Sequence, residues 1–377
     1  MTKNILLAGI PAENPTLYRA VGMAAGDPAA WLSLDGEATL IIRDIEMQRA
    51  RTVGKPHRVA CPADFTPAGG LDPDRATATA QAAAECLRRE GISQITADRS
   101  LPFIFAWHAM QAGIEVAYDA DLGVIDRRVK SAEEIEYLRR AQAVTEEGMQ
   151  TLCRWIARCS ADAEGTLHHD GEVLTSERAK GLIGAFFLER NFTMGHGCIV
   201  ATAPHSADCH DSGTGPLRTG VPIIVDLFPR DESTRYWGDC TRTVVHGTPT
   251  ETVLKMHRAV VEAKAAGIAK LLPGNAAAEV HHAVIETQQR HGFALSRGQV
   301  SDEPTIQHGT GHGIGLEVHE PILLDDGGGP MLAGEVFTVE PGLYGRLEGS
   351  VRVEDMIVVT EQGPEILNRL PEGLNWE

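Results

Sequence analysis

Five side chains in the second half of the sequence have the types and spacing to bind a pair of divalent metal ions: Asp226, Asp239, His312, Glu340 and Glu354. The four carboxylates carry four negative charges and two divalent cations carry four positive charges, so the cluster is neutral with metal and self-repelling without it. Two metals held in this way can generate a hydroxide at neutral pH and polarise a carbonyl group. Hydrolysis of a stable amide needs this chemistry, and the sequence therefore predicts a metallohydrolase.

The first two carboxylates belong to neighbouring predicted strands. In GVPIIVDLFP the apolar run 223–225 reads as a buried strand, and Asp226 follows where an unpaired charge is costly. The segment YWGDCTRTVV brings Asp239 back after a loop with hairpin signals, so we expect the two aspartates to face each other from antiparallel strands. A single Asp at a strand end favours a structural interpretation, whereas the pair favours a cation between them.

The last two carboxylates repeat this arrangement. EVFTVEPGLY places Glu340 at the end of an apolar strand, before a Pro-Gly turn. GSVRVEDMIVV places Arg352 and Glu354 on one face by the two-residue period of a strand. Arg352 can then orient a carboxylate of the cluster and is a candidate substrate-binding residue. Asp355 points to the opposite face by the same period, so we expect a structural or surface role for it.

The segment HGTGHGIGLEVHE supplies the imidazole, and we assign His312 as the metal ligand among His308, His312 and His319. Its glycines disfavour a helix and let the backbone approach a ligand closely. The spacing of a phosphate-binding loop is absent. Four carboxylates and one imidazole suit manganese, cobalt, iron or zinc rather than a metal that prefers thiolates.

Other histidines fall into two groups. His210, in ATAPHSADCH, lies shortly before the first metal strand and is a candidate site residue, with His205 as its rival. Cys209, next to His210, and Cys240, next to Asp239, are expected to serve packing. We expect surface or ordinary packing positions for the rest of the histidines considered, which are His168, His169, His281, His282 and His291.

Size and charge limit the possible partners. The 377 residues exceed what one core usually supports, which predicts two domains. The 52 acidic and 34 basic residues give a formal charge of −18, which disfavours nucleic acid and anionic membranes as partners. Seven scattered cysteines without a C-x-x-C pair fit a reducing compartment. The first residues lack a secretory pattern and no stretch approaches a membrane span, so we expect a cytoplasmic protein.

The predicted elements divide at a capping box, Ser131-Ala-Glu-Glu134. Before it we expect a hairpin turning at Asp35-Gly36 and helices at about 75–90 and 103–111. After it we expect a long amphipathic helix, then two α/β halves closing on one site. The elements expected there are helices near 176–190, 251–271 and 276–291, and strands near 196–202, 221–228, 236–246, 335–340 and 350–360.

These segments resemble the pita-bread metallopeptidases, specifically the Xaa-Pro group of prolidase (Xaa-Pro dipeptidase) and aminopeptidase P. The resemblance runs through IIVDLFP, YWGDCTRTV, HGTGHGIGLEVHE, TVEPGLY and VRVED, and includes all five ligands in order. It implies an α/β (α+β) fold with a creatinase-like amino-terminal domain at 1–128 and a pita-bread catalytic domain at 129–377, usually as a homodimer. Methionine aminopeptidases share the ligands but usually lack the extra domain and the EPGLY and RVED contexts.

The resemblance also implies a role for each ligand. Asp226 would chelate one metal, His312 and Glu340 would bind the other, and Asp239 and Glu354 would bridge the two. The cofactor would be two divalent ions per chain, manganese in preference to cobalt, zinc or iron.

A hydroxide bridging those metals would attack the carbonyl before proline in a peptide substrate, while Glu340 shuttles its proton. His210 and His319 would bind the substrate carbonyl or the tetrahedral oxyanion. Alignment of ATAPHSADCH with the family's segment favours His210 over His205.

The sequence departs from the family in two places. Asp226 and Asp239 are 13 residues apart where the family usually has 11, and we expect the hairpin tip to absorb the difference. The segment before His210 lacks the common Ser-Gly pattern, which affects the substrate pocket. Two alternatives remain: a metal-independent creatinase-like amidinohydrolase, whose chemistry does not need four converging carboxylates, and a catalytically silent peptide-binding module, which could lose ligands freely.

Overall fold

The computed structural model describes residues 3–376, and the chain separates into two compact units, Met1–Asp126 and Arg127–Glu377. The division into domains at 128/129 stays a prediction that lies two residues from this boundary. Within residues 3–376, no helix is both long and apolar enough to cross a membrane.

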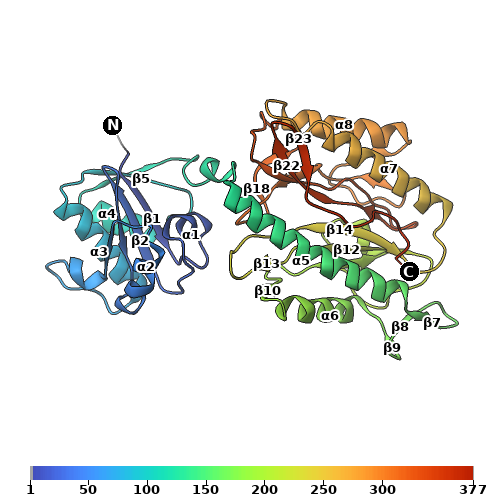
Figure 1. The fold of residues 1–377 in the computed structure, drawn as a ribbon, viewed down its shortest axis with the longest axis horizontal. Coiled ribbons are helices and arrows are strands. Elements are labelled where there is room, and N and C mark those ends of the chain that lie inside the picture. Colours follow the sequence, from blue (N-terminus) through green and yellow to red (C-terminus); the bar gives the residue numbers. More distant parts are fainter. Residues whose placement is uncertain (1–2, 377) are drawn as a thin grey trace. The chain divides into compact units, whose positions relative to one another are not determined.

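The first unit is built on a six-stranded sheet with the order β4-β3-β2-β1-β5-β6 (Figure 1). The predicted hairpin is confirmed, because β2 and β3 pair antiparallel and both turn residues, Asp35 and Gly36, have positive φ. Apolar side chains of α3 and α4 pack against the sheet in one core. The elements are β1 (Ile5–Gly9), α1 (Pro15–Val21), β2 (Ala29–Leu34), β3 (Glu37–Ile41), α2 (Met47–Val53), β4 (Arg58–Ala60), α3 (Arg75–Arg89), β5 (Gln94–Ala97), α4 (Phe103–Gln111) and β6 (Glu115–Tyr118).

The second unit begins with the helix that the capping box predicts, α5 (Ala132–Ala157). The Ser131 hydroxyl accepts from the Glu134 backbone N–H, and the Glu134 carboxylate accepts from the Ser131 N–H, so both halves of the box form. A small sheet of β7 (Ser160–Ala161), β8 (Leu167–His169) and β9 (Glu172–Val173) follows, and then α6 (Ser176–Leu188).

Two sheets of this unit, each covered by a pair of helices, form its two halves (Figure 1). In the first, α5 and α6 pack on a sheet of order β11-β12-β14 through one continuous apolar core. In the second, α7 and α8 lie side by side on a sheet of order β18-β17-β19-β22-β23. The strands of the two sheets are β11 (Ile199–Thr202), β12 (Pro222–Leu227), β14 (Cys240–Val245), β17 (Gly311–Gly313), β18 (Glu320–Leu324), β19 (Val336–Val339), β22 (Asp355–Thr360) and β23 (Gly363–Ile366).

The two helices of the second half and several short strands complete the unit. The helices are α7 (Glu251–Ile268) and α8 (Ala277–Arg290), and the short strands are β10 (Phe192–Thr193), β13 (Arg230–Asp231), β15 (Ala294–Leu295), β16 (Thr305–Ile306), β20 (Gly342–Leu343) and β21 (Val351–Arg352). The predicted helices and strands are present with ends shifted by a few residues, except that the strand predicted near 350–360 is divided into β21 and β22, which belong to different sheets.

Candidate metal centre

The first pair of predicted ligands lies on neighbouring antiparallel strands. Three apolar residues of β12 are buried, so the strand carries Asp226 into the interior, where it pairs in register with Thr241. Asp239 comes directly before β14, two positions from Thr241 and therefore on the same face. Asp226 is 8% exposed and Asp239 is 3% exposed, so both carboxylates lie inside the protein.

The second pair occupies the matching place in the other sheet. The ladder between β19 and β22 pairs Val339 with Asp355, and one step further its register sets Glu340 opposite Glu354. Like charges opposite each other destabilise a sheet. Glu354 is 2% exposed, so little solvent screens this repulsion.

Contacts between the two halves join these pairs into one cluster. The Thr241 hydroxyl donates to Glu354 Oε2 at 2.7 Å, and the Glu354 backbone N–H donates to the Thr241 carbonyl at 3.1 Å. From the other side, Arg352 Nη2 donates to Asp226 Oδ2 at 2.5 Å. Consequently one ligand atom from each of three residues lies within 4.8 Å of the others: Asp239, His312 and Glu354.

The imidazole of His312 is presented to this cluster in one tautomer. Its Nδ1 lies 3.0 Å from the carbonyl of Gly313, which can only accept, so Nδ1 carries the proton and Nε2 offers a lone pair. Nε2 lies 3.8 Å from Asp239 Oδ2 and 3.6 Å from Glu340 Oε1. Burial, with His319 nearby, lowers the pKa of His312 to about 3, so the ring is neutral, as a metal ligand must be.

A glycine lets the loop of His312 approach β19. A Cβ on Gly311 would overlap the carbonyl of Thr338, and its φ of 159° is a conformation that L side chains rarely adopt. The close contact and the dihedral angle both favour a glycine there.

The pKa values of the four carboxyl groups are raised because these groups are buried close together. Burial is the largest cause that raises the pKa of all four, and neighbouring carboxylates add to it for Asp239, Glu340 and Glu354. The pKa of Glu340 reaches about 7. One buried oxygen, Asp226 Oδ1, has no hydrogen-bond partner among the described residues. An orphaned carboxylate oxygen beside three grouped donors is what a divalent cation would satisfy, so the residues fit the predicted metals.

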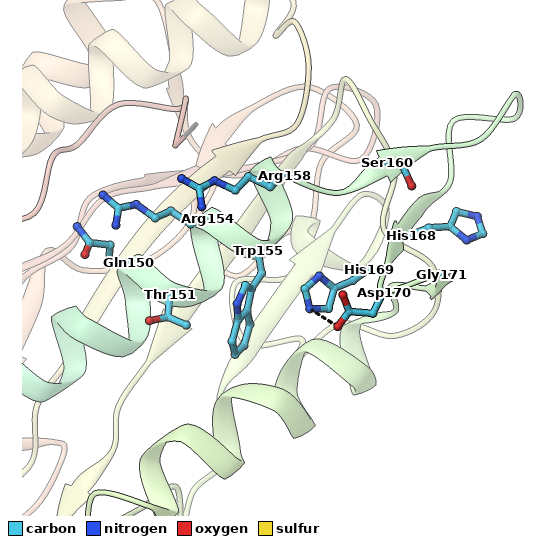
Figure 2. A pocket seen from close by; sticks show the side chains of 10 residues that line it. All are labelled: Gln150, Thr151, Arg154, Trp155, Arg158, Ser160, His168, His169, Asp170 and Gly171. Atoms are coloured by element: carbon cyan, nitrogen blue, oxygen red, sulfur yellow. Dashed lines mark ion pairs between the residues drawn. The ribbon is translucent and has the colours of Figure 1, made fainter.

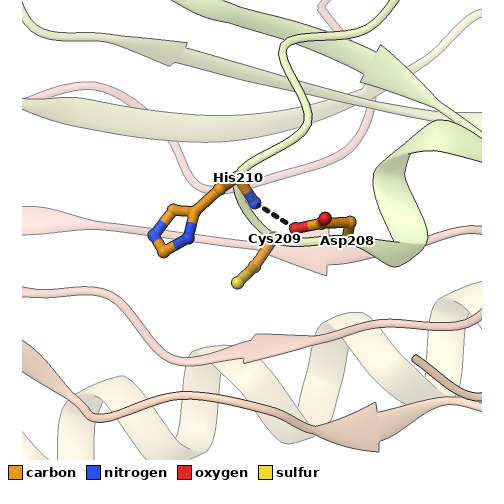
Figure 3. Close-up of side chains that lie close together, drawn as sticks. All are labelled: Asp208, Cys209 and His210. Carbon is orange, nitrogen blue, oxygen red and sulfur yellow. Dashed lines mark hydrogen bonds between the residues drawn. The ribbon is translucent and has the colours of Figure 1, made fainter. Parts of the chain in front are cut away.

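Two further histidines lie near the cluster. The His319 ring meets the His312 ring edge to face, with centroids 4.3 Å apart. His210 is exposed, and the backbone carbonyl of the adjacent Cys209 accepts from Arg352 Nη1 at 3.2 Å, which holds the loop of His210 beside the cluster. Figure 3 shows His210 beside Asp208 and Cys209 in the loop after β11. The rival His205 pairs instead with Asp211 at 3.3 Å.

Asp355 stays outside the cluster, as its strand position predicts. Its carboxylate is 4% exposed and pairs with Arg242 at 2.8 Å and with Lys264. The structural role is confirmed, and the surface alternative is wrong. Arg242 also donates to the backbone carbonyl of Glu354 at 2.5 Å, so this buried ion group supports a strand that carries a candidate ligand.

Several residues that the sequence does not assign to the site hold it in place. The Tyr344 hydroxyl lies 2.6 Å from His308 Nε2 and 3.1 Å from Arg352 Nη1, and all three side chains form one network behind Asp226. His281 lies buried on α8, with Nδ1 2.9 Å from the Thr310 hydroxyl in the glycine-rich loop. Only the HGTGH motif could have signalled His308, and no local pattern marks Tyr344 or His281.

A separate cavity of about 520 Å³ lies along α5 (Figure 2). Arg154 and Trp155 of the helix, and Arg158 at its C-cap, line the cavity together with His168 and His169 of β8. The sequence predicts surface or packing positions for these histidines, and the structure adds acidic partners, Asp162 for His168 at 3.0 Å and Asp170 for His169 at 3.5 Å. None of the predicted site residues lines this cavity.

Comparison with known proteins identifies the family of this chain. Residues 136–361 match the model of metallopeptidase family M24. The chain is 31% identical over 297 residues to Xaa-Pro aminopeptidase 2 of Streptomyces coelicolor, which is 69% of this chain and 59% of that protein. It is 30% identical over 245 residues to the probable dipeptidase PepE of Mycobacterium tuberculosis, which is 63% of this chain and 62% of that protein. The chain thus spans about three fifths of the length of these relatives.

Solved structures share the fold. The Xaa-Pro dipeptidase from Bacillus anthracis matches with a TM-score of 0.80 at 22% identity, covering 99% of this chain and 94% of that one. The X-Pro aminopeptidase from Thermotoga maritima matches with a TM-score of 0.80 at 21% identity, covering 98% and 96%. The predicted fold, a small amino-terminal α/β domain followed by a pita-bread domain, is confirmed. With the family match across residues 136–361, this chain belongs to metallopeptidase family M24.

Proposed function

We propose that this protein is a metal-dependent exopeptidase that hydrolyses the peptide bond before proline, as an Xaa-Pro dipeptidase or an Xaa-Pro aminopeptidase. The observation that carries the proposal is the convergence of Asp239, His312 and Glu354 within 4.8 Å, with the orphaned oxygen of Asp226 nearby. The names of the relatives supply the choice of bond.

The proposed cofactor is two divalent ions, manganese first among them. Asp226 would hold one ion, His312 and Glu340 the other, and Asp239 and Glu354 would bind both. When bound, such ions lower the pKa of water to near neutrality and polarise the scissile carbonyl.

The chain's own residues complete the reaction. Glu340 would accept a proton from the attacking water and return it to the departing proline nitrogen. The rings of His210 and His319 would donate hydrogen bonds to the substrate carbonyl oxygen, and more strongly to the oxyanion that forms from it.

Arg352 would position the site rather than react. It holds Asp226 through the ion pair at 2.5 Å, and Tyr344 and the carbonyl of Cys209 fix its guanidinium at 3.1 and 3.2 Å. We further propose that the protein is a cytoplasmic homodimer acting on proline-containing peptides, in accord with the expectations from sequence.

A peptide panel with manganese tests the function. Xaa-Pro dipeptides and Xaa-Pro-Yaa peptides are incubated with the full chain, and release of the first residue is measured. Cleavage of dipeptides alone indicates a dipeptidase, and cleavage of longer peptides an aminopeptidase. Glu340→Gln should abolish release, whereas Glu286→Gln, on the exposed face of α8, should retain it. Absence of release with manganese, cobalt, zinc and iron would refute the proposal.

A further inference from the structure

Three consecutive residues in the loop after β11 bring different donor atoms together beside the metal centre: Asp208, Cys209 and His210 (Figure 3). A carboxylate oxygen, a thiol sulfur and an imidazole nitrogen, one from each residue, all lie within 4.8 Å of one another. This set differs from the buried cluster because it contains sulfur and because Asp208 and His210 are exposed.

The backbone explains why neighbouring side chains gather here. The His210 backbone N–H donates to Asp208 Oδ1 at 3.0 Å, which folds the three residues into a tight turn. The carbonyl of Cys209 accepts from Arg352 Nη1 at 3.2 Å, which ties the turn to the metal centre. The donors are therefore held close before any ligand arrives.

The donor atoms are available to a ligand. Within residues 3–376, neither ring nitrogen of His210 nor the sulfur of Cys209 has a hydrogen-bond partner, and the second oxygen of Asp208 is also unused. Tetrahedral zinc with sulfur, nitrogen and oxygen ligands needs donor separations of about 3.2–3.6 Å. Rotation of the exposed Asp208 and His210 side chains would be needed to bring the donors from within 4.8 Å to this separation, and a water molecule would take the fourth position.

We propose that Asp208, Cys209 and His210 form a third cation site, selective for a soft divalent ion such as zinc or cadmium, and that its occupation inhibits the protein by withdrawing the His210 ring from the substrate. The inhibition rests on the proposed function, whereas the binding does not. Binding replaces the thiol proton of Cys209, which leaves to solvent, by a sulfur–metal bond.

The sulfur ligand sets the selectivity. Manganese prefers oxygen donors, so it fills the carboxylate cluster and leaves this site open, whereas zinc and cadmium gain from a thiolate. The formal charge of −18 draws cations of either kind toward the protein.

Cadmium titration of the manganese-loaded full chain tests the binding, because a thiolate–cadmium bond adds a charge-transfer absorption that carboxylates and imidazoles do not give. We expect a saturable absorption at about one cadmium per chain, lost in Cys209→Ser and weakened about ten-fold or more in Asp208→Asn. The matched control is Cys61→Ser, since Cys61 and Cys209 are the two cysteines of the chain that are not fully buried. An absorption that survives in Cys209→Ser, or that never appears in the parent chain, overturns the site.

Zinc inhibition of the manganese-loaded protein tests the consequence. Peptide release is normalised to each variant's own rate without zinc, and the zinc concentration for half inhibition should rise about ten-fold or more in Cys209→Ser but not in Cys61→Ser. Equal inhibition of the two variants overturns the inhibitory role even where cadmium binds. A chain without peptidase activity that still shows the cadmium absorption refutes the proposed function and the inhibition but supports the site.

Discussion

The metal-free protein should lose stability as the pH rises toward neutrality, and Glu340 gives the size of the loss. Only 19% of this side chain is exposed, and burial raises its pKa from 4.5 to about 7. Between these two values the folded state holds a proton that the unfolded chain releases, so the folded state binds more protons. Its contribution to stability is therefore full below about pH 4.5 and is lost as the pH rises through 7.

The displacement of this pKa corresponds to about 3 kcal/mol. For a unit of the size of Arg127–Glu377, about 3 kcal/mol lowers the melting temperature by roughly 6–12 °C. The other three carboxyls of the cluster shift in the same direction, so the whole loss is larger. Bound divalent cations favour the ionised carboxylates, so they should remove this loss of stability with rising pH. At a free metal concentration of a hundred times Kd, each occupied site adds about 2.7 kcal/mol to the free energy of unfolding.

Thermal melting followed by circular dichroism between about pH 5 and pH 8, with a chelator or with manganese, measures this effect. Other groups titrate in the same range, so the decisive quantity is the difference between the parent chain and Glu340→Gln. The variant should melt higher than the parent near pH 8 in chelator, and Glu286→Gln should follow the parent. A parent chain whose melting temperature does not fall, or a Glu340→Gln variant that falls equally, refutes the reasoning.

Three further substitutions test contacts that hold the cluster and the catalytic domain in place. Thr241→Val removes the hydroxyl that donates to Glu354, and calorimetric manganese titration should show affinity reduced by about 10–100-fold; unchanged affinity counts against that support. Ser131→Ala removes the cap of α5 and should cost about 0.5–2 kcal/mol of stability in urea unfolding, with peptide hydrolysis per folded molecule retained. Gly213→Ala places a Cβ against the Val200 carbonyl at a φ of 80°, so its urea midpoint should fall well below that of Ser131→Ala, and an equal midpoint contradicts the contact.

The parts of the fold that follow local rules could be predicted from the sequence. The capping box at Ser131 and the Asp35-Gly36 turn act within four residues, and the buried strand before Asp226 follows from an apolar run. The candidate ligands could be predicted because a carboxylate at the end of a buried strand is costly to bury unless a cation or another partner compensates its charge.

The ion pairs and hydrogen bonds that hold the candidate ligands in place could not be predicted, because they join residues that are far apart in the chain. Arg242 meets Asp355 across 113 positions, and Lys264 meets the same carboxylate across 91. His281 reaches Thr310 from another element. Each partner is an ordinary helix or strand residue in its own segment, so only the packed structure reveals the pairing.

If side chains of both halves hold two cations together, the chain must retain about two manganese ions at equilibrium. Dialysis against manganese followed by atomic spectroscopy should give about two ions per chain for the parent and for Glu286→Gln, and fewer for Asp239→Asn and Glu354→Gln. These two variants remove one carboxylate from each sheet, so both must lose metal if the halves share one site. A parent chain that retains no manganese, or variants that both keep two ions, would contradict the account.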